Sequence, residues 1–493
     1  MNFFSSSGKD ARTNDGKFFQ NLLIGGSWIP AQSGRRIDVI DPSTEKVITT
    51  IADADLVDAT AAVDAAAAAA NAWASTSPRV RSEILRRCFE LMVLRLDELA
   101  HLISLENGKA IADAKGEVLY AAEFFRWFAE EAVRISGDIL VAPSGQNKIV
   151  VQHQPIGIAL LITPWNFPAA MATRKIAPAL AAGCTCILKP ATETPLTAYA
   201  IAAIMIEAGV PAGVVNVITT SSSGKVVDHI LHDARVRKLS FTGSTEVGRK
   251  LLRAAADQVI SCSMELGGNA PFIVFDDADI DAAIDGSMIA KMRNGGEACT
   301  AANRFFVQRN IFDVFGARLA ARMTALRVGP GYAPETQLGP LINAQSRDRI
   351  ATMVDDAVAA GAHRLGADFP VPAGPGFYFP PTVISDVRSD SPLLTEEIFG
   401  PVAVLMPFDT VDEVVSRANA TEYGLVAYVY SRDLAKALAV AERLESGMVA
   451  VNRGLVSDPA APFGGMKQSG VGREGAHVGL LEFTETKYVA VSW

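Results

Sequence analysis

The chain has 493 residues, of which 49% are hydrophobic and 20% are charged. At roughly 150 residues per domain, this length predicts about three domains and more than one hydrophobic core. The net charge of −9 arises from dispersed acidic and basic residues. Since no basic face is present to release counterions from phosphates, these features exclude a nucleic-acid partner.

Apolar residues are abundant, but the longest apolar runs, at 65–70 and 156–162, fall far short of the roughly 18 residues that span a membrane. No membrane association is therefore expected. Residues 1–19 lack the apolar stretch and cleavage site of a signal peptide and predict a loose tail. Five cysteines without C-x-x-C spacing, in a chain of this size, predict a reducing, cytoplasmic location.

The N-terminal part of the chain predicts strands followed by helices. Short apolar segments separated by Gly, Asp-Pro and Ser-Gly turns predict short strands within 22–52. Three long helical stretches follow, at 53–74, 81–108 and 113–136, with Gly108 and Gly137 as stop signals.

From residue 148 onward, apolar strands alternate with helices. Strands are predicted at 156–165, 184–190, 214–219 and 238–244, with helices at 171–183, 197–209 and near 226–232. Parallel strands need crossover helices and are buried on both faces, so this α/β pattern predicts a doubly wound parallel sheet of the dinucleotide-binding kind.

A second α/β block is predicted from 271 to about 448. It has strands at 271–275, 305–308, 379–385, 402–408 and 426–431, and a helix that begins in 276–286. Residues 482–493 end in a strand without a partner nearby in the sequence. No repeat or low-complexity linker divides the chain, so the domains are expected to pack closely around a cleft.

Three residues are candidates for catalysis, although each has an ordinary structural interpretation. Cys299 follows Gly295 and Gly296, where an open backbone leaves a thiol accessible, yet most single cysteines are core residues. Glu265, next to two glycines, is either a paired structural charge or a base whose pKa is raised by burial. Asn166 follows an apolar strand at the end where α/β sheets bind ligands, but an isolated Asn is more often a turn or cap residue.

Other reactive side chains favour structural roles. Cys184 and Cys186 alternate on one strand and predict core packing. His229 and His232 share a helix face but lack neighbouring ligands, so no metal is expected.

Taken together, these segments closely resemble the aldehyde dehydrogenase superfamily. The resemblance extends from about Leu23 to Tyr488 and includes TPWNFP, LKPATETP, FTGSTEVG, MELGGNAP, GGEAC, EEIFGP and PFGGMKQSGVGRE. It implies a Rossmann-like cofactor domain (1–135 and 153–267), an α/β catalytic domain (268–476) and a small β oligomerisation arm (136–152 and 477–493).

The resemblance also implies a mechanism that the chemistry of the residues supports. The Cys299 thiolate adds to an aldehyde, and the Asn166 amide and the Cys299 backbone N–H hold the oxyanion. Hydride then passes to a nicotinamide. Glu265 deprotonates the water that hydrolyses the resulting thioester.

Cofactor residues follow from the same resemblance. The segment FTGSTEVG predicts a strand, a glycine turn and a helix N-terminus that favours phosphate. Family members that prefer NAD often carry Glu three residues after the family lysine, Lys189, where this chain has Thr192. We therefore predict that NADP is preferred and NAD is also used, although the neighbouring Glu193 acts against this choice. The cofactor-binding residues are expected to be Thr163, Pro164, Trp165, Lys189, Thr192, Gly243, Ser244, Gly248, Leu266, Glu397 and Phe399.

For the substrate, the chain resembles the succinate semialdehyde dehydrogenase branch. There, residues corresponding to Arg174, Arg293 and Ser457 bind the substrate carboxylate. Succinate semialdehyde is the expected substrate, and glutarate semialdehyde or a broader range of aldehydes are the alternatives. A different functional class is also an alternative, a catalytically silent relative with a structural or binding role. Some relatives carry a second cysteine two residues after the nucleophile, but this chain has Ala301, so no local disulfide switch is expected.

The remaining expectation concerns assembly. The segment 136–154 and the C-terminal strand resemble the family's oligomerisation arm, in which a neighbouring subunit completes an edge strand. A homodimer or homotetramer is expected.

Overall fold

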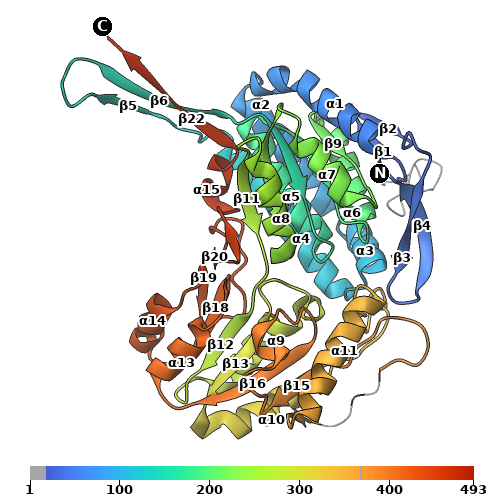
Figure 1. Ribbon diagram of the computed structural model, residues 1–493, viewed down its shortest axis with the longest axis vertical. Coiled ribbons are helices and arrows are strands. Elements are labelled where there is room, and N and C mark those ends of the chain that lie inside the picture. The colour runs from blue at the N-terminus through green and yellow to red at the C-terminus, as the bar shows by residue number, and fades with distance from the viewer. Residues whose placement is uncertain (1–17, 367–368, 370, 493) are drawn as a thin grey trace.

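The computed structural model describes residues 18–366, 369 and 371–492. Two α/β lobes lie one above the other in Figure 1, and a narrow arm of strands projects from the upper lobe. Residues 1–17 of the predicted tail lie outside the described part. Its last two residues, Phe18 and Phe19, pack against the core of the upper lobe, and Phe19 stacks on Trp28.

The first strands confirm the prediction for residues 22–52. They are β1 (Leu22–Ile24), β2 (Ser27–Ile29), β3 (Arg36–Asp41) and β4 (Lys46–Ala52). The strands β1 and β2 extend the large sheet of the upper lobe, whereas β3 and β4 pair with each other.

Four helices follow where three were predicted. They are α1 (Leu56–Ala74), α2 (Pro78–Leu94), α3 (Leu96–Asn107) and α4 (Ile111–Glu131). The prediction of one helix over 81–108 was wrong because Arg95 leaves helical geometry, with φ −106° and ψ 26°. Its buried guanidinium pairs with Glu207 at 3.0 Å, so a tertiary contact sets the break.

The upper lobe contains the predicted doubly wound parallel sheet. Five adjacent strands are parallel: β7 (Ile158–Ile162), β8 (Thr185–Lys189), β9 (Val215–Val217), β10 (Val236–Thr242) and β11 (Ser261–Glu265). The crossover helices are α5 (Pro168–Ala182), α6 (Pro195–Ala208), α7 (Ser223–Leu231) and α8 (Thr245–Ala256). Antiparallel edge strands β1 with β2, and β21 (Gly470–Val471), complete an eight-stranded sheet.

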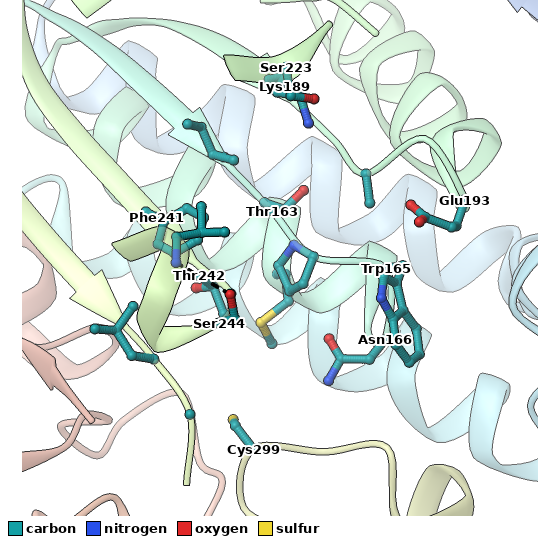
Figure 2. A pocket seen from close by; sticks show the side chains of 18 of the residues that line it. Thr163, Trp165, Asn166, Lys189, Glu193, Ser223, Phe241, Thr242, Ser244 and Cys299 are labelled. Atoms are coloured by element: carbon teal, nitrogen blue, oxygen red, sulfur yellow. Dashed lines mark hydrogen bonds between the residues drawn. The ribbon is translucent and has the colours of Figure 1, made fainter. Parts of the chain in front are cut away.

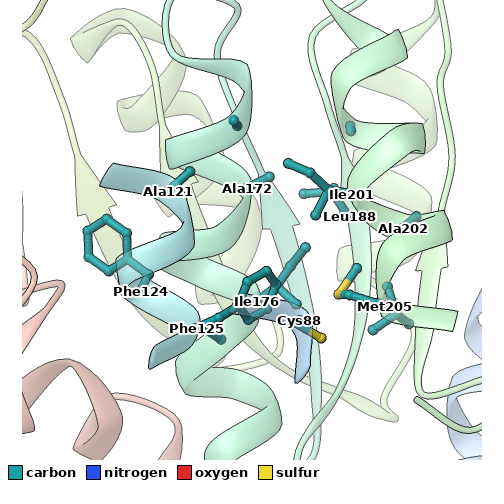
Figure 3. Close-up of a cluster of buried hydrophobic side chains, with 14 of the residues drawn as sticks. Cys88, Ala121, Phe124, Phe125, Ala172, Ile176, Leu188, Ile201, Ala202 and Met205 are labelled. Carbon is teal, nitrogen blue, oxygen red and sulfur yellow. The ribbon is translucent and has the colours of Figure 1, made fainter. Parts of the chain in front are cut away.

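The core of this lobe is apolar and tightly filled, as Figure 3 shows for one cluster. Phe125 and Ile176 are fully buried there. Cys184 and Cys186 are also buried, at 1% and 0% exposed, which confirms their predicted packing role.

The lower lobe has a seven-stranded sheet of order β14-β15-β16-β13-β12-β18-β19. Its strands are β12 (Ala270–Val274), β13 (Ala302–Gln308), β14 (His363–Leu365), β15 (Thr382–Ser385), β16 (Val402–Phe408), β18 (Val426–Tyr430) and β19 (Met448–Val451). All pairs are parallel except β14 with β15. Its helices are α9 (Ile280–Met292), α10 (Phe312–Thr324), α11 (Ala344–Ala359), α12 (Pro392–Thr395), α13 (Val411–Asn419) and α14 (Leu434–Arg443), and β17 (Tyr423–Gly424) pairs with β20 (Met466–Lys467).

The arm is a separate three-stranded sheet of order β22-β6-β5. It contains β5 (Asp138–Val141), β6 (Lys148–Pro155) and β22 (Thr484–Val491), and α15 (Ala476–Leu481) leads into β22. The C-terminal strand, which had no partner nearby in sequence, pairs along its whole length with β6.

The sheets suggest how the chain is divided, but the predicted domain boundaries remain a prediction. Strand β21 lies late in the chain yet joins the sheet of the upper lobe. Among the helices that the structure describes, none has both the length and the apolar composition to cross a bilayer.

Candidate active site

A cavity of about 680 Å³ lies at the carboxyl ends of β7, β8 and β10. This is the position where open α/β sheets bind ligands. Cys299 and Asn166 lie on opposite sides of one end of this cavity in Figure 2. Among the predicted residues, the following line the cavity: Thr163, Pro164, Trp165, Asn166, Lys189, Thr192, Gly243, Ser244, Leu266, Cys299, Glu397 and Phe399.

The nucleophile loop, residues 293–299, places Cys299 at the cavity. A short 3-10 turn, Arg293–Gly296, follows α9 and contains left-handed residues. At Gly296, φ is +79° and an added Cβ would lie 2.3 Å from the Gly400 carbonyl oxygen, so only glycine fits. The backbone therefore turns sharply enough to bring the thiol to the cavity wall.

The Cys299 thiol needs a base to become a nucleophile. Burial raises the pKa of this thiol to about 12, and the neighbouring Arg174 acts to lower it. The carboxylates of Glu397 and Glu265 raise it further. With this pKa, the Cys299 thiol is protonated at neutral pH.

Asn166 is connected to the nucleophile loop by hydrogen bonds. Its Nδ2 donates to the Glu297 carbonyl oxygen at 2.9 Å. The Asn294 amide in turn donates to the carbonyl oxygens of Asn166 and Glu297, at 2.9 and 3.0 Å. A primary amide has two N–H groups, so one remains to donate to an oxygen on the substrate.

Glu265 ends β11 and is 2% exposed. Burial raises the pKa of its carboxyl well above the ordinary value, and the neighbouring Glu474 raises it further. In the part of the chain that the structure describes, Oε2 of Glu265 has no hydrogen-bond partner. A raised pKa makes the Glu265 carboxylate a stronger base than an ordinary carboxylate, and its free oxygen can accept a proton.

The three predicted substrate-binding residues, Arg174, Arg293 and Ser457, do not line this cavity. They lie near one another around Tyr120. Arg174 on α5 is 1% exposed; its Nε pairs with Glu474 at 2.5 Å, and its guanidinium lies 4.2 Å from the Phe463 ring centroid. The guanidinium of Arg293 lies 5.1 Å from the Phe167 ring centroid. Both arginines affect the pKa of Cys299, which places them near the nucleophile.

Tyr120 on α4 joins this group and was missed by sequence reasoning. Its buried hydroxyl has no hydrogen-bond partner among the described residues. Burial raises the pKa of this hydroxyl, while the nearby charges of Arg174 and Arg293 and the nearby side chain of Ser457 lower it. One residue thus connects all three predicted substrate-binding residues. The available signal was helical spacing, because Tyr120 lies three residues after the buried Glu117 on the same helix.

The cavity wall on the side of α8 suits a dinucleotide. This helix begins at Thr245, directly after Gly243 and Ser244, and Ser244 caps it by accepting from the Val247 N–H. The N-terminus of a helix presents free N–H groups and a positive dipole end, which suit a pyrophosphate. Gly248 does not line the cavity. A Cβ there would lie 2.5 Å from the Leu266 side chain, so this glycine lets α8 pack closely.

At the end of the cavity away from Cys299 in Figure 2, Lys189 and Thr192 lie on the wall with Glu193. The Thr192 hydroxyl donates to the Glu193 carboxylate at 3.3 Å. Ser223 and Gly224, at the start of α7, also line this end and were not predicted. They lie in the first turn of α7, and this segment carries no motif of its own.

Glu397, which also lines the cavity, accepts from the Gly268 N–H at 3.1 Å. Burial raises the pKa of its carboxyl to about 7. Phe399 meets Trp165 edge to face, with ring centroids 5.4 Å apart. Arg349, a further lining residue that was not predicted, donates to the carbonyl oxygen of Ile398 at 2.6 Å and so supports this loop.

Metal chemistry has no evident ligands here. Within residues 18–366, 369 and 371–492, no three His, Cys, Asp or Glu side chains lie close enough to hold an ion.

Comparison with known proteins places this chain among relatives of similar sequence and fold. The sequence model of the aldehyde dehydrogenase family matches residues 28–489. The chain is 54% identical to the succinate-semialdehyde dehydrogenase of Paenarthrobacter nicotinovorans, over 90% of this chain and 99% of that protein. It is 46% identical to the glutarate-semialdehyde dehydrogenase of Pseudomonas putida, over 96% of this chain and 98% of that protein. The crystal structure of an NADP-dependent enzyme of E. coli superposes with a TM-score of 0.94 at 45% identity, covering 97% of this chain and 98% of that one.

Proposed function

The chain belongs to the aldehyde dehydrogenase family, and on that basis we propose that it oxidises succinate semialdehyde to succinate with NADP as its preferred cofactor. The observation that carries this proposal is the convergence of Arg174, Arg293, Ser457 and Tyr120 beside Cys299. Two guanidinium groups and two hydroxyls form a site for a carboxylate.

Catalysis begins when the Cys299 thiol loses its proton to the solvent and becomes a thiolate, while the Glu265 carboxylate stays deprotonated for the later attack of water. The sulfur then adds to the aldehyde carbon, so that a C–S bond forms and the carbonyl π electrons move to the oxygen. The Asn166 Nδ2 and the Cys299 backbone N–H donate to this oxygen and stabilise its negative charge.

A bound nicotinamide supplies the hydride-accepting chemistry at this carbon. Lys189, Thr192, Ser244, Glu397 and Phe399 are the residues that would hold the dinucleotide. The acyl group remains on the Cys299 sulfur as a thioester. Glu265 takes a proton from water, the resulting hydroxide attacks the thioester carbon, and the C–S bond breaks to release succinate and the thiolate.

The preference for NADP is supported by the side chains around Thr192. A hydroxyl and Lys189 can donate to a 2′-phosphate, which a carboxylate at position 192 would repel. In this structure the Thr192 hydroxyl gives its one hydrogen to the Glu193 carboxylate, so donation to a 2′-phosphate requires that the hydroxyl exchange this partner. The similar E. coli structure is that of an NADP-dependent enzyme. NAD is the proposed second cofactor.

Glutarate semialdehyde is a second candidate substrate because the chain is 46% identical to a dehydrogenase for that compound. The two substrates differ by one methylene group. A single methylene is worth roughly 1–3 kcal/mol in a fitted pocket, so both compounds can be turned over at different rates.

We also propose that the protein forms a homodimer or homotetramer through its arm. Strand β5 is an edge strand with a row of exposed apolar residues, at 71%, 54% and 60% for Ile139, Leu140 and Val141. Such an edge favours pairing with a second chain. A reducing compartment, the cytoplasm, fits an enzyme whose five cysteines are all unpaired.

Initial rates over a panel of aldehydes test the proposal. Succinate semialdehyde, glutarate semialdehyde and butanal are each assayed with NADP and with NAD. We expect the highest kcat/KM for succinate semialdehyde with NADP, and a large loss for butanal, which lacks the carboxylate. Equal kcat/KM for butanal would contradict the carboxylate site, and no turnover of any aldehyde would indicate a catalytically silent relative.

A further inference from the structure

A fully buried ion pair lies directly beneath the turn that carries Asn166. Lys109 Nζ and Glu117 Oε2 are 2.5 Å apart, and their side chains are 1% and 0% exposed. Lys109 follows α3 and Glu117 lies on α4. The mechanism described above uses neither residue.

Lys109 contacts the Asn166 turn in two ways. Its ammonium donates to the Asn166 carbonyl oxygen at 2.6 Å, a short charge-assisted hydrogen bond. The same ammonium lies 4.2 Å from the ring centroid of Phe167, the next residue. One side chain thus contacts both the backbone and the aromatic ring of this turn.

Glu117 holds the other end of the turn. While Oε2 binds Lys109, Oε1 accepts from the backbone N–H groups of Ala169 and Ala170, at 2.8 and 3.3 Å. These N–H groups belong to the first turn of α5. The pair therefore fixes residues 165–170 from both sides.

The nucleophile loop is joined to the same framework. The Asn166 carbonyl oxygen that binds Lys109 also accepts from Asn294. The Asn294 backbone N–H donates to Asp113 at 2.8 Å, and Asp113 lies one turn before Glu117 on α4. One face of α4 thus holds the proposed oxyanion donor and the loop of Cys299 in a fixed relation.

We propose that Lys109 and Glu117 are positioning residues that aim the Asn166 amide at the oxygen of the thiohemiacetal. This inference depends on the role of Asn166 in the proposed function. An oxyanion donor acts only if its direction is fixed in advance, and a displacement of about 1 Å can cost roughly 100-fold in rate.

A purely structural role makes a different prediction. A buried ion pair is weak evidence for stability, since replacing both partners by neutral groups of similar volume is often neutral or stabilising. If the pair served only the fold, a neutral replacement that folds would keep the wild-type kcat. If the pair positions Asn166, kcat falls even when the fold is intact.

The test uses the full-length enzyme, the aldehyde on which it is most active, and saturating cofactor. The main variant is Lys109→Met combined with Glu117→Gln, called the neutral pair, because it leaves no unpaired buried charge and the Gln oxygen still accepts from Ala169. Glu117→Gln alone is the second variant, because burial lowers the pKa of Lys109 and the amine can lose its proton there, so that no unpaired charge remains. Lys115→Met is the matched control, because Lys115 lies on the same helix but is 47% exposed and pairs with Asp97.

We expect the neutral pair to lower kcat by about 10- to 100-fold with little change in KM or in the thermal unfolding midpoint, while Lys115→Met leaves all three unchanged. Glu117→Gln alone is expected to lower kcat by a smaller factor, because Lys109 can still donate to Asn166. Wild-type kcat in a folded neutral pair, or in Glu117→Gln if only that variant folds, would overturn the inference.

A double-mutant cycle with Asn166→Ala separates this inference from the proposed function. Asn166→Ala keeps the backbone carbonyl but removes the amide. If the pair acts through that amide, adding the neutral pair, or Glu117→Gln, to Asn166→Ala causes little further loss of kcat. Losses that multiply would overturn the inference and leave the proposed mechanism intact. Unchanged kcat in Asn166→Ala alone would instead refute the oxyanion role on which the inference depends.

Discussion

Replacing Arg293 by methionine should separate recognition of the substrate carboxylate from catalysis. The side chain of Arg293 lies beside Phe167 and acts on both Tyr120 and Cys299. Methionine keeps much of the apolar volume but removes the charge and all the N–H donors. Arg293 is a cleaner target than Arg174, because Arg174 also pairs with Glu474, and both of these charges act on the pKa of Glu265, Glu474 raising it and Arg174 lowering it.

The size of the effect follows from one charge-assisted interaction. A hydrogen bond to a charged group contributes about 1.5–3 kcal/mol. At about 1.4 kcal/mol per factor of ten, Arg293→Met should lower kcat/KM for succinate semialdehyde by roughly 10- to 150-fold. Most of the change should be in KM, because the carboxylate is bound equally in the ground and transition states.

Steady-state rates with succinate semialdehyde and with butanal measure this prediction. Butanal has the same carbon chain but no carboxylate, so Arg293→Met should lower its kcat/KM much less than that of succinate semialdehyde, through loss of a charge that lowers the pKa of Cys299. Arg309→Met is a suitable control, because Arg309 lies on the surface of the lower lobe and forms an exposed ion pair with Asp409. Equal losses with both aldehydes would refute the reasoning, since the arginine would then be acting on the common chemistry.

Three further predictions concern the cofactor, the substrate and the pH dependence. Thr192→Glu should lower kcat/KM for NADP by at least about tenfold while NAD is retained, since a carboxylate there repels the 2′-phosphate; an unchanged ratio in cofactor titrations would contradict this. Tyr120→Phe should raise KM for succinate semialdehyde by about 2- to 10-fold through loss of one hydrogen bond to the substrate carboxylate, while KM for butanal stays unchanged. The raised pKa values of Cys299 and Glu265 mean that their reactive, deprotonated forms are lost as pH falls. A pH-rate profile of kcat/KM should therefore rise from acidic to alkaline pH, and a flat profile would contradict the assigned base.

The parts of the fold that local patterns determine could be predicted from the sequence. The apolar strand 158–162 and its crossover helix were predicted because a parallel strand is buried on both faces and leaves a continuous apolar run. The break at Arg95 could not be predicted, because it depends on Glu207, more than one hundred residues away. The partner of β22 was hidden for the same reason.

The site shows the same division between local and long-range information. Cys299 and Asn166 lie in distinctive segments, and both reach the cavity as expected. Tyr120 has no motif of its own, since an aromatic residue on an amphipathic helix usually packs in a core. Its closeness to Arg174 and Ser457 arises only when α4 and the loop before β20 meet in the folded chain.

The cofactor role of Gly248 stays a prediction, although the structure shows a packing role for this glycine. It ends the segment FTGSTEVG, which resembles a phosphate-binding turn, and was predicted to bind the cofactor. In the structure it lies against Leu266 and not on the cavity wall. A glycine at such a position can serve close packing of the helix as readily as contact with a phosphate.

The central claim is that an acyl group passes through the sulfur of Cys299, and trapping the thioester tests it most directly. Glu265→Gln removes the base that activates water, so the acyl group should accumulate on the enzyme. This variant is mixed with succinate semialdehyde and NADP, quenched with acid within the first turnover, digested and examined by mass spectrometry. We expect one succinyl group on the peptide that contains Cys299, in an amount equal to the NADPH formed. NADPH formation without this adduct, or an adduct on a different cysteine, would contradict the account.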